Sequence, residues 1–222
     1  MNLMPSLLSV ALIATFQSAL ALTLIPSDHI QSNLLRLSYK GIPANSYSFE
    51  GGKLKIAVKS SSSPVVIPFE IPKKLHHLTL SGEILSIPEF KNADDFILRV
   101  GPAFSGKRTL GAFDKLFAPK WITQMNSLAE KMGVGFGGLD LNLISPTPGP
   151  TWKQRKHPKS DLIHESIALI VDKTGKFQIA KEYSQSENTT LGIWIGSDGD
   201  DSKVSFDVVV EQLEADFYGD EK

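Results

Sequence analysis

Apolar residues that recur at every second position constrain the fold of this chain more than any other feature. In the segment from Asn45 to Ile71 the apolar side chains Leu54, Ile56 and Val58 alternate with polar ones, and Gly51-Gly52 interrupts the segment as a turn does. Successive side chains of a strand point to opposite faces, so this pattern predicts strands that bury one face in a core.

Several later segments have the same extended character. The connections between the early strands are too short to hold crossover helices, so the first half of the chain is predicted to be antiparallel. The sequence therefore predicts a mainly β protein, an antiparallel β-sandwich in one domain over residues 22–222. The later predicted strands are 77–87, Asp94–Gly101, Leu139–Ile144, Glu165–Asp172, Lys176–Tyr183 and a pair within Leu191–Phe217.

The last predicted strand changes phase along its length. Phe206, Val208 and Val210 share one face, whereas Leu213 and the apolar residues after it continue on the opposite phase. One residue has been added near Glu211-Gln212, as a β-bulge adds it. Bulges bend sheets, so the sequence favours a curved sandwich over a flat sheet.

Two helical regions interrupt the strands. A short helix is predicted between Ser27 and Leu37, and a helical insert is predicted over residues 111–132. Pro119 suits the start of a second helix within the insert, and Gly133 suits the position just after its end. The apolar stripes of the insert are Leu110, Phe113, Leu116 and Phe117, followed by Ile122, Met125, Leu128 and Met132.

The N-terminus reads as a secretory signal peptide. The first charged residue is Asp28, and the apolar run Leu7–Ala21 ends in Ala19-Leu20-Ala21, with small residues at the positions that signal peptidase requires. Cleavage after Ala21 predicts a periplasmic or secreted protein without a membrane span in its mature chain. A membrane anchor or a buried N-terminal helix is the alternative, although about 20 apolar residues are needed to cross a bilayer.

Composition excludes several classes of function. The net charge is −1 and the chain has no cysteine. No global field favours nucleic acid or anionic lipid, and disulfides, thiolate zinc sites, iron–sulfur clusters and a cysteine nucleophile are ruled out. The stretch 101–109 approaches a phosphate-binding loop, but Arg108 stands where a hydroxyl must bind the metal.

A Pro-rich loop, Ser145–Asp161, holds the strongest candidate binding site. Loops of this length within a compact domain are uncommon and often functional. The Trp152 indole can stack on a ligand. The Arg155 guanidinium can bind a carboxylate, sulfate or phosphate with two hydrogen bonds. Alternatively, the tryptophan plugs the edge of the sandwich and the lysines only solvate the loop. The ligand-binding candidates are Trp152, Lys153, Arg155, Lys156 and His157, with Lys159 in the same basic run.

Three functions remain open from these residues. The leading hypothesis is non-catalytic binding of an envelope glycan, an acidic polysaccharide or another acidic ligand by this loop. The second is a glycan hydrolase or lyase, although no G-x-S-x-G or H-E-x-x-H motif appears. The third is an envelope assembly protein that offers a sheet edge or the amphipathic helix 119–132 to a partner. Candidate acids and bases for the enzyme are His157, Asp161, His164 and Glu165.

The acidic stretch Ser197–Asp201 has two interpretations. Asp198, Asp200 and Asp201 could bind Ca²⁺, the single cofactor that the sequence suggests, but the stretch lacks full calcium-loop spacing and a terminal bidentate Glu. Asp-Gly between two alternating apolar segments is typical of a β-hairpin. The sequence therefore favours a hairpin turn over a calcium site.

Parts of the chain resemble an uncharacterised family of exported bacterial proteins. The resemblance rests on the Ser-rich extended segment 47–71 with LTLSGEI after it, on DDFILRVG (94–101) and on KVSFDVVVEQLEADF (203–217). It covers about half of the mature chain and includes no catalytic signature. It implies a jelly-roll-like β-sandwich in the periplasm and no activity, and the helical insert departs from the family's pattern.

Overall fold

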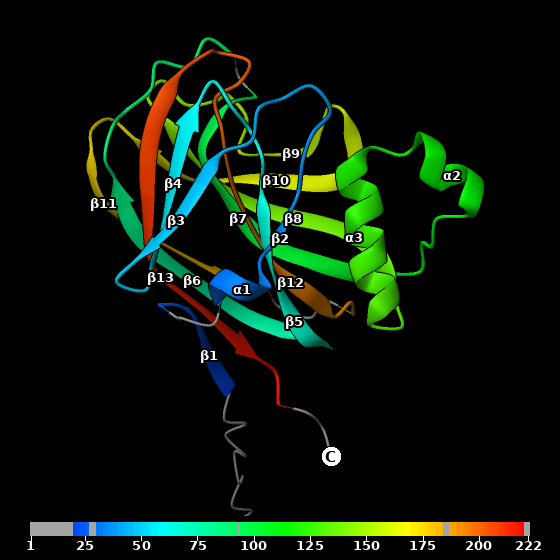
Figure 1. Cartoon of the computed structure of the whole chain (residues 1–222). Coiled ribbons are helices and arrows are strands. Elements are labelled where there is room, and N and C mark those ends of the chain that lie inside the picture. The colour runs from blue at the N-terminus through cyan, green and yellow to red at the C-terminus, as the bar shows by residue number, and fades with distance from the viewer. Residues whose placement is uncertain (1–19, 27–29, 93, 184–186, 220–222) are drawn as a thin grey trace, which may run out of the picture.

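A computed structural model describes residues 20–26, 30–92, 94–183 and 187–219, which form two β-sheets packed face to face. Two helices lie on the outer side of one sheet (Figure 1). The predicted signal peptide, residues 1–21, lies outside the described residues except for Leu20 and Ala21, which begin the first strand. None of the helices in the described part of the chain is long and apolar enough to span a bilayer.

The first sheet, sheet A, is antiparallel throughout, because each of its strand pairs runs in opposite directions. Its strand order is β11-β6-β13-β4-β3, and β1 also pairs with β13. The strands are β1 (Leu20–Ile25), β3 (Ser46–Glu50), β4 (Lys53–Lys59), β6 (Leu75–Ile84), β11 (Gly175–Glu182) and β13 (Ser205–Phe217).

The second sheet, sheet B, has the order β2-β5-β12-β7-β8-β10-β9. Its pairs are antiparallel except β8 with β10, which are parallel because the intervening chain passes along the sheet edge as β9 before β10 begins. The strands are β2 (Leu35–Arg36), β5 (Val65–Lys73), β7 (Phe96–Gly106), β8 (Gly135–Pro146), β9 (Gln154–His157), β10 (Ser160–Val171) and β12 (Thr190–Asp198).

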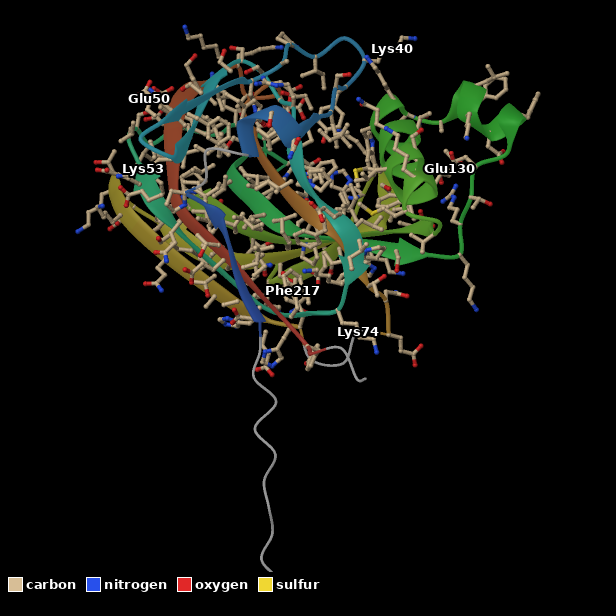
Figure 2. All side chains as sticks on the ribbon, turned by 60° about the horizontal axis from the view of Figure 1, so that its bottom comes forward. Lys40, Glu50, Lys53, Lys74, Glu130 and Phe217 are labelled. Atoms are coloured by element: carbon tan, nitrogen blue, oxygen red, sulfur yellow. The ribbon has the colours of Figure 1, made fainter. Side chains whose placement is uncertain are left out.

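The main core lies between the two sheets. Strand β13 buries Phe206, Val208 and Val210 in it and then Leu213 and Phe217. Its register against β6 shifts between Val210 and Gln212, which confirms the predicted bulge. Figure 2 shows side chains filling the interior, while labelled charged residues such as Lys40 and Glu130 lie at the periphery.

A second core lies on the outer face of sheet B, under the helical insert. The insert forms α2 (Ala112–Phe117) and α3 (Lys120–Lys131), with Pro119 between them, as predicted. Helix α3 buries Trp121, Met125 and Ala129, which are spaced four residues apart and share one face. The apolar face of the predicted helix 119–132 is therefore packed on this chain's own sheet, and α2 carries the insert's exposed apolar side chains.

The predicted helix between Ser27 and Leu37 ends earlier than expected, and its first three residues lie outside the described residues. Among the described residues of this segment, Ile30–Asn33 form α1, and β2 begins at Leu35. Leu35 and Arg36 leave the helix because they pair with Val66 and Val65 at the edge of sheet B.

Two predictions about the connecting segments were wrong. The acidic stretch 197–201 is not a hairpin turn, because β12 belongs to sheet B and β13 to sheet A. Residues 199–204 therefore carry the chain from one layer to the other. The predicted loop 145–161 is also shorter than expected, because Gln154–His157 adds the edge strand β9 by pairing with β10.

Candidate functional site

A cavity of about 230 Å³ opens on the outer face of sheet B beside the start of α3. Part of its lining is apolar, and the rest carries polar and charged side chains from β7, β9, β10 and β12 and from the loops between strands. The apolar lining residues include Trp121, Ile122, Leu141, Ile163 and Trp194; the polar ones include Asp94, Arg99, His157, Lys159, Glu165, Asp198, Asp200 and Asp201.

The apolar wall is a rigid part of the second core. The Trp121 ring of α3 packs edge-on against the Trp194 ring of β12, with ring centroids 5.7 Å apart. Leu141 and Ile163 belong to the same buried cluster, on the neighbouring strands β8 and β10. Because all four side chains are largely buried, this wall keeps its shape without a ligand.

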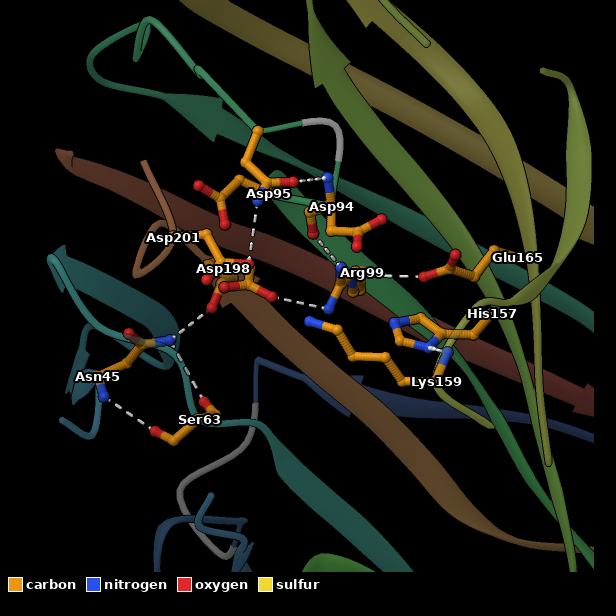
Figure 3. Close-up of polar contacts among 12 residues, drawn as sticks. Asn45, Ser63, Asp94, Asp95, Arg99, His157, Lys159, Glu165, Asp198 and Asp201 are labelled. Atoms are coloured by element: carbon orange, nitrogen blue, oxygen red, sulfur yellow. Dashed lines mark hydrogen bonds and ion pairs between the residues drawn. The ribbon is translucent and has the colours of Figure 1, made fainter. Parts of the chain in front are cut away.

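The charged wall is organised around Arg99 on β7. Arg99 Nη1 lies 2.8 Å from Asp198 Oδ2 at the end of β12, and Arg99 Nε lies 3.7 Å from Glu165 Oε1 on β10. Its Nη2 also donates to the carbonyl oxygen of Asp94. Figure 3 shows Arg99 between Glu165 and Asp198, with His157 and Lys159 beside them.

Arg155 extends this network to the edge of the sheet. It lies opposite Glu165 in the pairing of β9 with β10, and its Nε is 2.6 Å from Glu165 Oε2. Its Nη2 is 2.8 Å from Asp94 Oδ1. Although burial raises the pKa of Asp94, the hydrogen bond and charge of Arg155 outweigh this effect and hold that pKa below its usual value.

Burial shifts the protonation of two further groups at the cavity. It raises the pKa of Asp198 to about 6; Arg99 opposes this shift and the nearby Asp200 carboxylate adds to it. Burial also lowers the pKa of His157, whose Nδ1 accepts a hydrogen bond of 3.1 Å from the Lys159 backbone N–H. His157 therefore contributes no charge to the wall at neutral pH.

The residues of the predicted binding loop have different surroundings in the structure. Arg155 stacks over the Trp152 ring, 4.1 Å from its centroid, and that half-buried ring packs edge-on against Phe96. Both side chains thus contact the protein itself, while Lys153 and Lys156 are exposed to solvent. Of this basic stretch, His157 and Lys159 line the cavity.

The candidate acids and bases are not brought together in one place. His157 and Glu165 line the cavity beside α3, whereas Asp161 and His164 line a second cavity of about 520 Å³ with Asp140 and Lys181. Glu165 borders both cavities. His164 and Glu165 are adjacent on β10, so their side chains leave opposite faces of the strand.

The candidate cation ligands are partly regrouped. Asp198 and Asp200 lie together with Asp95, and one carboxylate oxygen of each is within 4.8 Å of the others. Asp201 instead accepts a hydrogen bond of 3.3 Å from the Asn92 side chain. Sequence reasoning missed Asp95 and Arg99; a charged residue inside the apolar run FILRVG was the available signal.

Comparison with known proteins adds little to this geometry. No family model and no curated protein matches the sequence. Among solved structures, the chain is similar to a protein of unknown function from Shewanella oneidensis MR-1, with 10% sequence identity over 99% of each chain and a TM-score of 0.29. A likeness at that level carries no argument about function.

Proposed function

We propose that this protein binds one sugar unit of a glycan, without catalysis, in the cavity between α3 and the outer face of sheet B. The observation that carries the proposal is the division of the cavity into two walls. Trp121 and Trp194 form part of its apolar lining, while Arg99, Lys159 and Asp198 present donors and acceptors in the charged part of the same lining. A sugar ring has apolar C–H faces and a rim of hydroxyl groups, and such a site complements both.

The size of the cavity limits the ligand to a small group. Pockets for drug-sized ligands occupy about 300–1,000 Å³, and this cavity of about 230 Å³ lies below that range. It suits a single ring, such as the end or one projecting unit of a longer chain.

The charges of the wall favour a neutral glycan over the acidic one that the basic loop suggested. The described lining residues include five carboxylates, from Asp94, Glu165, Asp198, Asp200 and Asp201, but only two cations, Arg99 and Lys159. Arg155 is already bound to Glu165 and Asp94. An acidic sugar would meet net repulsion here, whereas the hydroxyls of a neutral sugar can donate to the carboxylates.

A pair of lysine variants tests the proposal. Lys159, on the β9–β10 turn, lines the cavity, and Lys156 is an exposed lysine of the adjoining strand β9 that does not. The wild-type protein and both variants would be applied to a printed array of neutral and acidic oligosaccharides. The best-retained oligosaccharide would then be titrated by calorimetry. We expect Lys159→Ala to weaken binding about tenfold, the effect of losing one charged hydrogen bond, and Lys156→Ala to leave it unchanged.

Two results would refute the proposal. One is an array on which the wild-type protein retains no glycan. The other is a glycan that binds equally well to wild-type protein and to Lys159→Ala, since the site would then lie elsewhere. Strong preference for acidic oligosaccharides, lost in Lys156→Ala, would return the site to the exposed loop.

A glycan hydrolase or lyase is the second candidate, because Asp198 is a cavity-lining carboxyl whose pKa is raised to about 6. A carboxyl that titrates near neutral pH can act as a general acid. Release of reducing ends or unsaturated sugars from a polysaccharide panel, abolished by Asp198→Asn, would favour this function. Binding without turnover would favour the first proposal.

A further inference from the structure

Three aspartates from two distant segments meet at one side of the cavity. Asp95 immediately precedes β7, Asp198 ends β12, and Asp200 lies in the segment that crosses from sheet B to sheet A. Hydrogen bonds fix both segments: Ser202 N donates to Asp95 Oδ2 at 2.7 Å, and Gly199 N donates to the Ser61 carbonyl at 3.2 Å.

The Asp95 carboxylate gives a second, independent indication of a ligand site at this position. The residue is only 2% exposed, and its Oδ1 has no hydrogen-bond partner within residues 20–26, 30–92, 94–183 and 187–219. A buried carboxylate oxygen without a partner loses its hydration and gains nothing in return, which costs several kcal/mol in general. Its position beside Asp198 and Asp200 makes a cation the natural partner.

The described cations do not balance this cluster. Arg99 contacts Asp198 through Oδ2 and divides its charge between Asp198 and Glu165. No ion pair within the described residues joins Asp95 or Asp200 to a lysine or arginine.

We infer that Asp95, Asp198 and Asp200 form a binding site for a hard divalent cation, Ca²⁺. The three ligands offer only oxygen atoms, which calcium and magnesium prefer and which zinc and copper do not select. Calcium takes 6–8 oxygen ligands at distances that tolerate irregular geometry, so backbone carbonyls and waters complete the site. Two of these ligands, Asp198 and Asp200, are those that the sequence suggested, and Asp95 takes the place of the third candidate, Asp201.

The site lies on the wall of the glycan cavity, since Asp198 and Asp200 both line it. A cation held there presents its open coordination positions to the cavity, where two neighbouring sugar hydroxyls can occupy them. This second step rests on the proposed function, whereas cation binding itself does not.

Calcium titration of the full mature chain tests the site. After treatment with EDTA and dialysis, wild-type protein is titrated with CaCl₂ by calorimetry, and its thermal unfolding is followed with CaCl₂ or with EDTA. We expect one site with Kd of about 10⁻⁴–10⁻³ M, the range of extracellular calcium modules. We also expect a Tm that rises with calcium concentration. Titration with MgCl₂ should give weaker binding, because Mg²⁺ demands near-octahedral geometry.

Matched variants show whether these residues are the ligands. Asp95→Asn and Asp200→Asn should each weaken calcium binding at least tenfold, whereas Asp172→Asn, an exposed aspartate on the turn after β10, should leave it unchanged. Asp200→Asn carries the test if Asp95→Asn does not fold, because the hydrogen bonds of Ser202 N and Gly199 N that fix the two segments do not involve the Asp200 side chain.

Absence of calcium binding by wild-type protein at concentrations about tenfold above that range would overturn the inference, as would unchanged binding in Asp200→Asn. Glycan binding is measured separately with and without EDTA. Calcium binding without glycan binding would leave the site intact and refute only the proposed function.

Discussion

Glu165 is held by Arg155 from the adjacent edge strand, with 2.6 Å between Glu165 Oε2 and Arg155 Nε, and its side chain is only 1% exposed. Its other oxygen, Oε1, lies 3.7 Å from Arg99 Nε. A carboxylate between two guanidinium groups fixes β7, β9 and β10 relative to one another. The cavity wall therefore depends on an ion network that the sheet itself positions.

Removal of Arg155 should destabilise the fold strongly. Arg155→Met leaves Glu165 buried with one distant guanidinium, and losing one partner of a buried pair costs about 3–5 kcal/mol. We expect a loss in this range in the free energy of unfolding, measured by urea denaturation. The double variant Arg155→Met/Glu165→Gln should recover part of it, because no buried charge is then left unpaired. A double variant less stable than the single one would contradict this account.

The helical insert should respond differently at its two helices. Met125 of α3 is fully buried, whereas Phe117 of α2 is 74% exposed. Met125→Ala should cost about 2–5 kcal/mol because it leaves a cavity in the second core, and Phe117→Ala should change stability by no more than about 0.5 kcal/mol. Thermal unfolding of the two variants checks this contrast. Equal losses would mean that α2 packs against the sandwich more closely than its exposure indicates.

Local pattern was enough to predict most of the strands and the insert. The alternation in Lys53–Lys59 and the change of phase near Gln212 are encoded within a few residues, so both features followed from the sequence. The acidic stretch 197–201 shows the limit of this reasoning. Asp-Gly favours a tight turn wherever it occurs. Only the long-range pairing of β12 with β7 and of β13 with β4 decides that this segment joins two different sheets.

The candidate site depended on contacts that no local pattern contains. Arg99 meets Asp198 and Glu165 because β7 lies between β12 and β8, with β10 beyond. The sequence identified Glu165 and Asp198 as candidates but attached them to different hypotheses. Asp95 joins Asp198 only through the tertiary fold. Arg155, which was expected to bind a ligand, is bound to Glu165 by the register of β9 with β10.

Cleavage of the predicted signal peptide after Ala21 should leave a chain that begins at Leu22. In sheet A, Leu22 pairs with Ala215 and Ile25 with Leu213, so β1 keeps most of its pairing after cleavage behind Ala21. We expect the mature protein isolated from outside the cytoplasm to have the mass of residues 22–222, determined by intact mass spectrometry. Replacing Ala21 by Arg should block processing, since the cleavage site requires a small residue. An unprocessed chain in the exported fraction would show that the N-terminal run is not a signal peptide.

His157 should make the fold less stable in mild acid. Burial lowers its pKa below the ordinary 6.5. The positive charges of Arg99 and Arg155 lower this pKa further, whereas the negative charges of Glu165 and Asp94 oppose the shift. As the pH falls below 6.5, the unfolded chain binds a proton that the folded chain does not, so the free energy of unfolding decreases down to the folded-state pKa. Asp198, whose pKa burial raises to about 6, takes up a proton in the folded chain over the same range and opposes this decrease. The His157 contribution is therefore measured as a difference in slope between proteins, by urea denaturation between pH 7.5 and pH 5, about 1 unit above and about 1.5 units below the ordinary pKa of His. His157→Gln should reduce the slope of the free energy of unfolding against pH, and His164→Gln, at an exposed position of β10, should keep it.

In NMR spectra of the imidazoles at neutral pH, His157 should be the Nε2–H tautomer, because its Nδ1 accepts the Lys159 N–H. An Nδ1–H tautomer, or a His157 pKa above 6.5, would contradict the buried environment described for this ring.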